Sequence, residues 1–194
     1  MKIGISQKQA KLDDRLYDCL DPQWYNLFSS HLLIPIPNIS NIELDPSIQC
    51  MILAGDKKIH DEKSIELMCF NHAVKYDIPL LAVGYSALYL NYLHNGINIP
   101  LAGHKKDHTV LMGGIVWNVN SDHDMGIYEL GSKLTQIAMS GDKTIEGFKH
   151  VRRPFWGLLW HPEQLDHVVL PPGFIKILNG EPYEKFQEPS RIDK

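Results

Sequence analysis

Two short apolar runs, each followed by a helical pattern, restrict the fold of this sequence more than any other feature. Residues 50–55 and 78–83 have the composition of strands that are buried on both faces of a sheet. Residues 64–76 and 86–94 follow them with apolar side chains at helical spacing. This alternation indicates an α/β fold with a mostly parallel central sheet flanked by helices.

The other segments extend this pattern without indicating a domain boundary. We expect a strand at 2–6, a polar loop at 7–14, a helix start at 21–28 in which Asp21 caps and Pro22 occupies the first turn, and a strand at 32–37. The second half predicts a small antiparallel sheet from short strands at 109–112, 115–119, 134–139 and 144–148, and a last strand at 155–160. Residues 1–194 are therefore predicted to form one domain whose polar tail, after Leu178, frays.

Composition excludes several classes of partner. A net charge of −4 argues against a nucleic-acid-binding face, and no apolar run is long enough to span a membrane. The first residues have the pattern of a strand rather than of a signal peptide. The three cysteines, Cys19, Cys50 and Cys69, are odd in number and lack CxxC spacing, which favours buried free thiols in a reducing cytoplasm.

Two glycines and one His-Pro-Glu segment mark the candidate site. Ligands of parallel α/β sheets bind beyond the carboxyl ends of the strands, and Gly55 and Gly84 follow two such ends. His161 and Glu163 follow the last predicted strand. We expect this imidazole and this carboxylate to face the turn at Gly84.

Six segments in order resemble the class I glutamine amidotransferase-like hydrolases, in particular the γ-glutamyl hydrolase branch. The segments are 3–6, 52–55, 79–91, 119–123, 142–146 and 160–163. The resemblance implies the flavodoxin-like fold of that family. It also implies a Cys-His-Glu site in which a thiolate attacks a γ-glutamyl carbonyl, the His moves the proton, and backbone N–H groups hold the oxyanion.

The resemblance assigns the site residue by residue, and the nucleophile is missing. The family Cys falls on Gly84, so the implied catalytic set is a vacant Gly84 with His161 and Glu163. The family Arg, Gly and Gln fall on Tyr85, Ser86 and Leu88, and its oxyanion glycines fall on Gly55 and Asp56. Substrate contacts are implied for Gly55, Asp56, Tyr85, Ser121, Asp122 and His123.

Several side chains allow two interpretations. Ser86 could replace the nucleophile, but its position favours capping of the helix that begins there. His104 and His108 could be a metal pair, but a solvated loop is favoured. Arg152 and Arg153 could bind a phosphate, with a basic turn as the simpler interpretation. We therefore expect no metal and no cofactor.

Three functions remain open at this point. The first is a protein that has lost thiol chemistry and binds a small γ-glutamyl or amide ligand. The second is an active hydrolase of a γ-glutamyl amide that uses another nucleophile or an activated water. Its substrate would be a γ-glutamyl nucleotide amidate of surface-glycan biosynthesis, as the segments 4–7 and 20–24 suggest. The third is a non-catalytic partner of a synthetase. A homodimer is an open alternative for the assembly.

Overall fold

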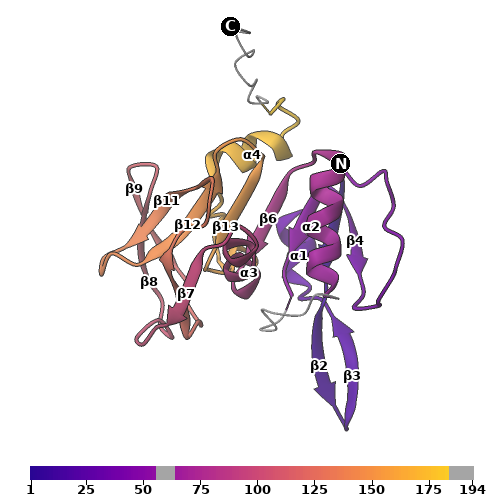
Figure 1. Cartoon of the computed structure of the whole chain (residues 1–194), viewed down its shortest axis with the longest axis horizontal. Helices are drawn as coiled ribbons and strands as arrows, with labels where there is room; N and C mark the ends of the chain where they lie inside the picture. The colour runs from indigo at the N-terminus through magenta and orange to yellow at the C-terminus, as the bar shows by residue number, and fades with distance from the viewer. Residues whose placement is uncertain (56–63, 184–194) are drawn as a thin grey trace, which may run out of the picture.

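A parallel half-sheet forms the centre of the molecule. The computed structural model describes residues 1–55 and 64–183 (Figure 1). Its five parallel strands lie in the order β4 (Leu32–Ile36), β1 (Lys2–Ser6), β5 (Cys50–Leu53), β6 (Leu80–Val83) and β13 (Phe155–Leu158). Strands β5 and β6 hold the two predicted apolar runs, and β1 lies at the strand predicted for residues 2–6.

An antiparallel half continues the same sheet beyond β13. It consists of β12 (Ile145–His150), β11 (Leu134–Ser140), β8 (His108–Met112) and β9 (Ile115–Val119), in that order. Two further strands, β10 (Met125–Glu129) and β7 (Ile97–Pro100), pair with each other, and β10 also pairs with β12. The predicted α/β fold with an antiparallel addition is confirmed, although the sequence did not indicate β7 or β10.

The segment expected to be a polar loop at 7–14 is instead most of a hairpin. β2 (Lys8–Leu12) and β3 (Arg15–Cys19) pair antiparallel and project away from the main sheet (Figure 1). Asp13 and Asp14 form the turn with φ of 45° and 61°, the left-handed pair that a two-residue hairpin requires. Every β3 side chain is exposed, so the strand carried no apolar alternation that could reveal it.

Two hydrophobic cores cover the two faces of the parallel half. In β5, Cys50 and Ile52 pack on one face, whereas Met51 and Leu53 pack on the other. The first core includes side chains of α1 (Gln23–Leu27) and α4 (Pro172–Leu178), and the second includes those of α2 (Ile65–Tyr76) and α3 (Tyr85–Leu93). Alternation along each strand therefore assigns successive residues to opposite layers of helices.

Local signals explain where α1 and α2 begin. The Asp21 carboxylate accepts a hydrogen bond from the Gln23 N–H at 2.9 Å, and the Ser64 hydroxyl accepts one from the Leu67 N–H at 3.2 Å. The last turn of α2 ends at Asp77, which is left-handed with φ of 50°. Over residues 1–55 and 64–183, no helix is long and apolar enough to cross a membrane.

A buried asparagine joins α3 to the antiparallel half. The Asn91 Nδ2 group donates to Asn98 Oδ1 at 2.9 Å and to the Glu129 carbonyl at 3.1 Å. Its Oδ1 accepts from the Gly131 N–H at 2.9 Å. Because the side chain is fully buried, water cannot replace these bonds. Asn91 therefore fixes α3, whose first residue follows Gly84, against β7 and β10.

Replacing Asn91 tests this connection. We expect Asn91→Ala to lower the free energy of unfolding by about 2–3 kcal/mol, because it leaves the buried Gly131 N–H and the Glu129 carbonyl without this partner. Urea unfolding measures the change. Asn26→Ala on exposed α1 is the control, and we expect it to change the free energy by less than about 0.5 kcal/mol. Equal effects of the two substitutions would contradict the role given to Asn91.

Candidate functional site

A sharp turn at Gly84 connects β6 to α3. Gly84 has φ of 59° and ψ of −125°, a conformation that is strained for residues with a Cβ. Its N–H donates to the Leu158 carbonyl at 2.8 Å, next to the end of β13. A strand-to-helix turn of this kind is the geometry that presents a nucleophile above an α/β sheet. Here the residue at the turn has no side chain to present.

His161 and Glu163 lie beside this turn. Register pairs Val83 with Leu158, so β6 and β13 end at the same level and the residues that follow them are neighbours. The His161 Nδ1 atom lies 2.9 Å from Glu163 Oε1, and the Glu163 side chain is fully buried. The imidazole is therefore oriented by a carboxylate, which is the arrangement of a general base.

The imidazole occupies the place that a side chain at position 84 would need. A Cβ built on Gly84 would stand 2.8 Å from His161 Nε2 and 3.1 Å from Cε1. Real Cβ contacts are longer than this, so a side chain at this turn requires the ring to move. The Nε2 atom thus faces, at close range, the turn at which the family resemblance predicted a nucleophile.

Asn120 holds the His161 backbone; it lies in the resembling segment 119–123 but was not among the predicted substrate contacts. Its Nδ2 donates to the His161 carbonyl at 2.8 Å, and its Oδ1 accepts from the His161 N–H at 2.8 Å. This two-bond clamp fixes the residue that carries the imidazole. The signal was available, since Asn120 directly precedes the predicted substrate segment 121–123, but an amide side chain does not reveal a backbone partner that is 41 residues away.

The predicted oxyanion glycine is bonded to side chains of its own protein. The Gly55 N–H donates to Glu66 Oε1 at 2.9 Å and to Ser86 Oγ at 3.0 Å, and the Ser86 hydroxyl donates to Glu66 Oε1. The N-cap of α3 is Gly84, so the expectation that Ser86 caps the helix is wrong. The Ser86 side chain is fully buried. A buried hydroxyl with two partners is also poorly placed for attack on a ligand. Asp56 lies outside the described residues.

The predicted substrate segment divides between the surface and the interior. Asp122 is exposed, whereas Ser121 and His123 are buried. The Ser121 hydroxyl donates to the His104 carbonyl, and His123 faces Glu146 rather than Gly84. The Tyr85 hydroxyl, which follows the elbow, donates to Asp124. Of the predicted contacts, Tyr85 and Gly55 are therefore the described residues that adjoin the turn.

None of the three cysteines substitutes for the missing thiol. Cys50 begins β5, at the opposite end from the elbow, and burial raises the pKa of its thiol to about 12. Burial, followed by the charge of Glu66, also raises the pKa of Cys69. Cys19 ends the projecting strand β3 and is exposed, so the expectation that it is buried is wrong.

The loop histidines differ from their expected environment. His104 and His108 were expected in a solvated loop, but His104 is buried and the His108 side chain is 21% exposed. Both rings face the fully buried carboxylate of Glu146. The sequence could not place Glu146 there, because the residue lies on β12, 38 positions beyond His108.

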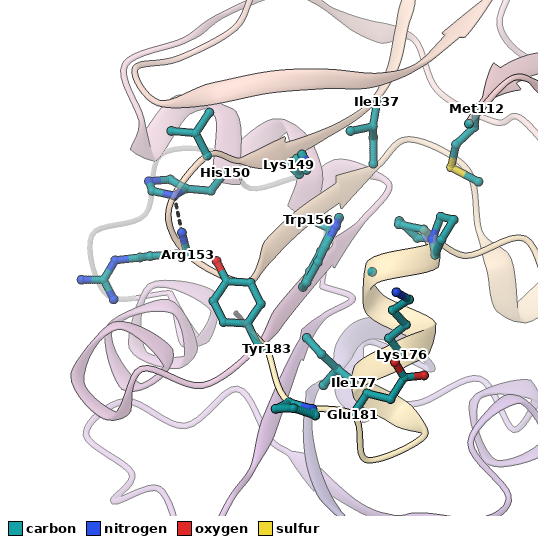
Figure 2. A pocket seen from close by; sticks show the side chains of 16 residues that line it. Met112, Ile137, Lys149, His150, Arg153, Trp156, Lys176, Ile177, Glu181 and Tyr183 are labelled. Carbon is teal, nitrogen blue, oxygen red and sulfur yellow. Dashed lines mark hydrogen bonds between the residues drawn. The ribbon is translucent and has the colours of Figure 1, made fainter. Parts of the chain in front are cut away.

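A groove of about 860 Å³ lies at the opposite end of β13 from the elbow. Its lining includes Lys149, His150, Arg153 and Lys176, with Trp156 on its wall (Figure 2). The Nδ1 atom of His150 accepts from the N–H groups of Arg152 and Arg153 at 3.0 and 2.7 Å. Arg153 also lies 3.6 Å from Asp77, which agrees with the simpler interpretation of a basic turn.

Sequence comparisons find similar proteins over most of the chain. Residues 102–163 match the model of the Peptidase C26 family. The chain is 27% identical over 188 residues to γ-glutamyl-CDP-amidate hydrolase of Campylobacter jejuni, across 84% of this chain and 90% of that protein. It is 27% identical over 140 residues to a glutamine-hydrolyzing GMP synthase subunit of Methanosarcina acetivorans, across 66% of this chain and 72% of that protein.

Solved structures agree on the architecture. A GMP synthase subunit of Thermoplasma acidophilum superposes with a TM-score of 0.64 at 20% identity, covering 87% of this chain and 86% of its own. PurLQS of Thermotoga maritima gives a TM-score of 0.64 at 13% identity, covering 84% and 88%. The fold is thus the flavodoxin-like fold that class I glutamine amidotransferases also have.

The His150 ring in the groove makes stability dependent on pH. Burial, followed by the charges of His94 and nearby arginines and lysines, lowers the pKa of His150 from 6.5 to about 4. The unfolded chain therefore binds a proton between these values that the folded chain does not, so stability falls as pH decreases from about 6.5 towards 4.

We expect His150→Asn to reduce this slope by up to about 1.4 kcal/mol per pH unit. The asparagine Oδ1 keeps an acceptor for the two N–H groups but cannot be protonated. Urea unfolding at a series of pH values measures the slope, with the exposed His167→Asn as the control. A slope unchanged by His150→Asn would show that this ring does not titrate as described.

Proposed function

We propose that this class I glutamine amidotransferase-like protein binds a γ-glutamyl amide beside Gly84 without cleaving it through a thiol. One observation carries the proposal: the oriented imidazole of His161 stands 2.8 Å from the point where a nucleophile's Cβ would be, and the residue there is glycine. The dyad and the elbow are kept, whereas the atom that would form the acyl intermediate is absent. Residues 1–194 would act as one cytoplasmic domain.

Two changes besides the missing thiol support a binding role. The Gly55 N–H, an oxyanion donor in the family pattern, is bonded to Glu66 and Ser86. One such donor is worth about 2.7–4 kcal/mol of transition-state stabilisation in enzymes that use it. The Gln of the family pattern falls on Leu88, which is apolar and fully buried. Several parts of the catalytic apparatus therefore differ together.

The relative from Campylobacter suggests the chemical class of the ligand. That protein is named for a γ-glutamyl amidate of a cytidine diphosphate, and the match to this chain spans most of both proteins. We propose a γ-glutamyl nucleotide amidate as the ligand, with the glutamyl part near Gly84 and Tyr85.

A second candidate is slow hydrolysis by water. The observation that favours it is the intact His161–Glu163 pair, whose Nε2 atom could take a proton from a bound water molecule. Such an activity would be insensitive to thiol reagents and would be lost in His161→Ala.

A third candidate, docking beside a synthetase, is supported by the relatives that are named as subunits of glutamine-hydrolyzing GMP synthases. Copurification of a synthetase with the tagged chain from its native cell would support it.

Hydrolysis and binding assays test the first proposal together. We expect titration calorimetry to detect binding of γ-glutamyl-CDP-amidate, and we expect no release of glutamate above background from this compound or from glutamine. Gly84→Cys should remain inactive, because the thiol would meet the His161 ring and the Gly55 donor would remain engaged.

Gly84→Ala is the matched control for strain. Both substitutions should lower the free energy of unfolding by about 1–3 kcal/mol, since both place a Cβ at the same positive φ. Turnover by the unmodified protein that disappears in His161→Ala would overturn the proposal in favour of hydrolysis. Absence of binding to either compound would overturn the ligand-binding role.

A further inference from the structure

Three histidine rings surround one buried carboxylate in the antiparallel half of the sheet. His104 Nδ1 lies 3.1 Å from Glu146 Oε1. His108 Nε2 and His123 Nε2 lie 3.6 and 3.5 Å from Glu146 Oε2. None of these three nitrogens, nor either oxygen of Glu146, makes a hydrogen bond within the described part of the chain. Five buried polar atoms therefore converge without partners that satisfy them.

The outer nitrogen of each ring is already engaged by an oxygen. His104 Nε2 lies 2.8 Å from Asp142 Oδ2, His123 Nδ1 lies 2.9 Å from the Met125 carbonyl, and His108 Nδ1 lies 3.3 Å from the Lys106 carbonyl. Carbonyl and carboxylate oxygens accept hydrogen bonds, so each outer nitrogen carries a proton. When a ring holds that single proton, its inner nitrogen directs a lone pair at the carboxylate.

Lone pairs that face an anion repel it unless a cation lies between them. Ligating histidines characteristically donate their other N–H to a carboxylate or a backbone carbonyl, and all three rings have such a partner here. Zinc binds nitrogen and oxygen ligands at about 2.0–2.2 Å, so the ligand atoms of a tetrahedral site lie about 3.3 Å apart. The nitrogen–oxygen separations of 3.1–3.6 Å, measured to Oε1 for His104 and to Oε2 for His108 and His123, are close to this spacing.

We propose that His104, His108, His123 and Glu146 bind a divalent transition-metal ion, with Zn²⁺ as the ion that the ligand set fits best. Imidazole nitrogens disfavour Mg²⁺ and Ca²⁺, which take oxygen ligands. The ligand atoms of His104, His108 and Glu146 lie within 4.8 Å of one another. His123 Nε2, which lies 3.5 Å from Glu146 Oε2, would be the fourth ligand. Four protein ligands in a buried site indicate a structural role.

The ion would fasten segments that are distant in the sequence. His104 lies between β7 and β8, His108 begins β8, and His123 lies between β9 and β10, whereas Glu146 belongs to β12. The loop that carries His123 also contains Asn120, which clamps His161, and Asp124, which binds Tyr85. Metal binding would thus stabilise the support of the elbow, although it does not depend on the function proposed for Gly84.

Metal content and affinity test the proposal on the full-length protein. We expect protein purified from zinc-supplemented culture to contain one Zn²⁺ per chain by mass spectrometry. After treatment with a chelator and dialysis, added Zn²⁺ should bind in calorimetry and raise the melting temperature. Co²⁺ should give the intense visible absorption of tetrahedral coordination. Less than about a tenth of an equivalent of bound zinc, with no change in melting temperature, would show that protons alone satisfy the cluster.

Substitutions distinguish the proposed metal ligands from Asp142, which positions the ligand His104. Glu146→Gln and His108→Gln should each abolish stoichiometric binding, and the partly exposed His108 provides a variant that disturbs the interior less. Asp142→Asn should weaken Zn²⁺ binding by about 10–100-fold, because it loosens the positioning of His104. The controls are His167→Gln and Asp166→Asn on the surface, which should bind zinc normally. Equal zinc affinity in His108→Gln and His167→Gln would overturn the assignment.

Discussion

The parallel pairing of β6 with β13 is the constraint on which the site depends. Val83 pairs with Leu158, and the hydrogen bond from the Gly84 N–H to the Leu158 carbonyl continues this alignment into the turn. The chain after each strand must therefore leave the sheet at the same edge, which places the elbow and His161 side by side although 77 positions separate them in the sequence. The dyad needs no other contact to face Gly84, and the Asn120 clamp and Glu163 then determine how the imidazole is presented.

This strand alignment positions the site whether or not residue 84 carries a reactive side chain. A residue with a Cβ at the elbow would strain the backbone, and such strain is found where the side chain takes part in catalysis. A protein that only binds a ligand does not need that strained side chain. Glycine removes that strain and lets the imidazole approach the turn. The Gly55 N–H also has acceptors within the protein, Glu66 and Ser86, and does not depend on a substrate oxyanion for a partner. Both features fit the binding role proposed above.

Features that depend on neighbouring residues in the sequence could be predicted. Contacts between residues that are distant in the sequence could not. The apolar runs of β5 and β6 identified the parallel centre because both faces of these strands are buried. The hairpin β2–β3 escaped prediction because its exposed side chains show no alternation that marks a strand. His161 and Glu163 were predicted together because only one residue separates them. Glu146 and the loop histidines, in contrast, meet only after β12 pairs with its neighbours. The solvated environment expected for His104 was wrong for this reason.

The loop between β9 and β10 connects the two parts of the molecule that carry chemistry. Asn120 binds the backbone of His161, Asp124 binds Tyr85, and His123, between them, faces Glu146 in the antiparallel half. A shift of this loop would therefore change the imidazole at the elbow and the histidine cluster together. Coupling of this kind requires only a short, rigid segment with contacts at both ends. An interaction that fixes His123 would also limit the movement of His161. A well-ordered antiparallel half therefore helps to hold the His161 imidazole in place beside Gly84.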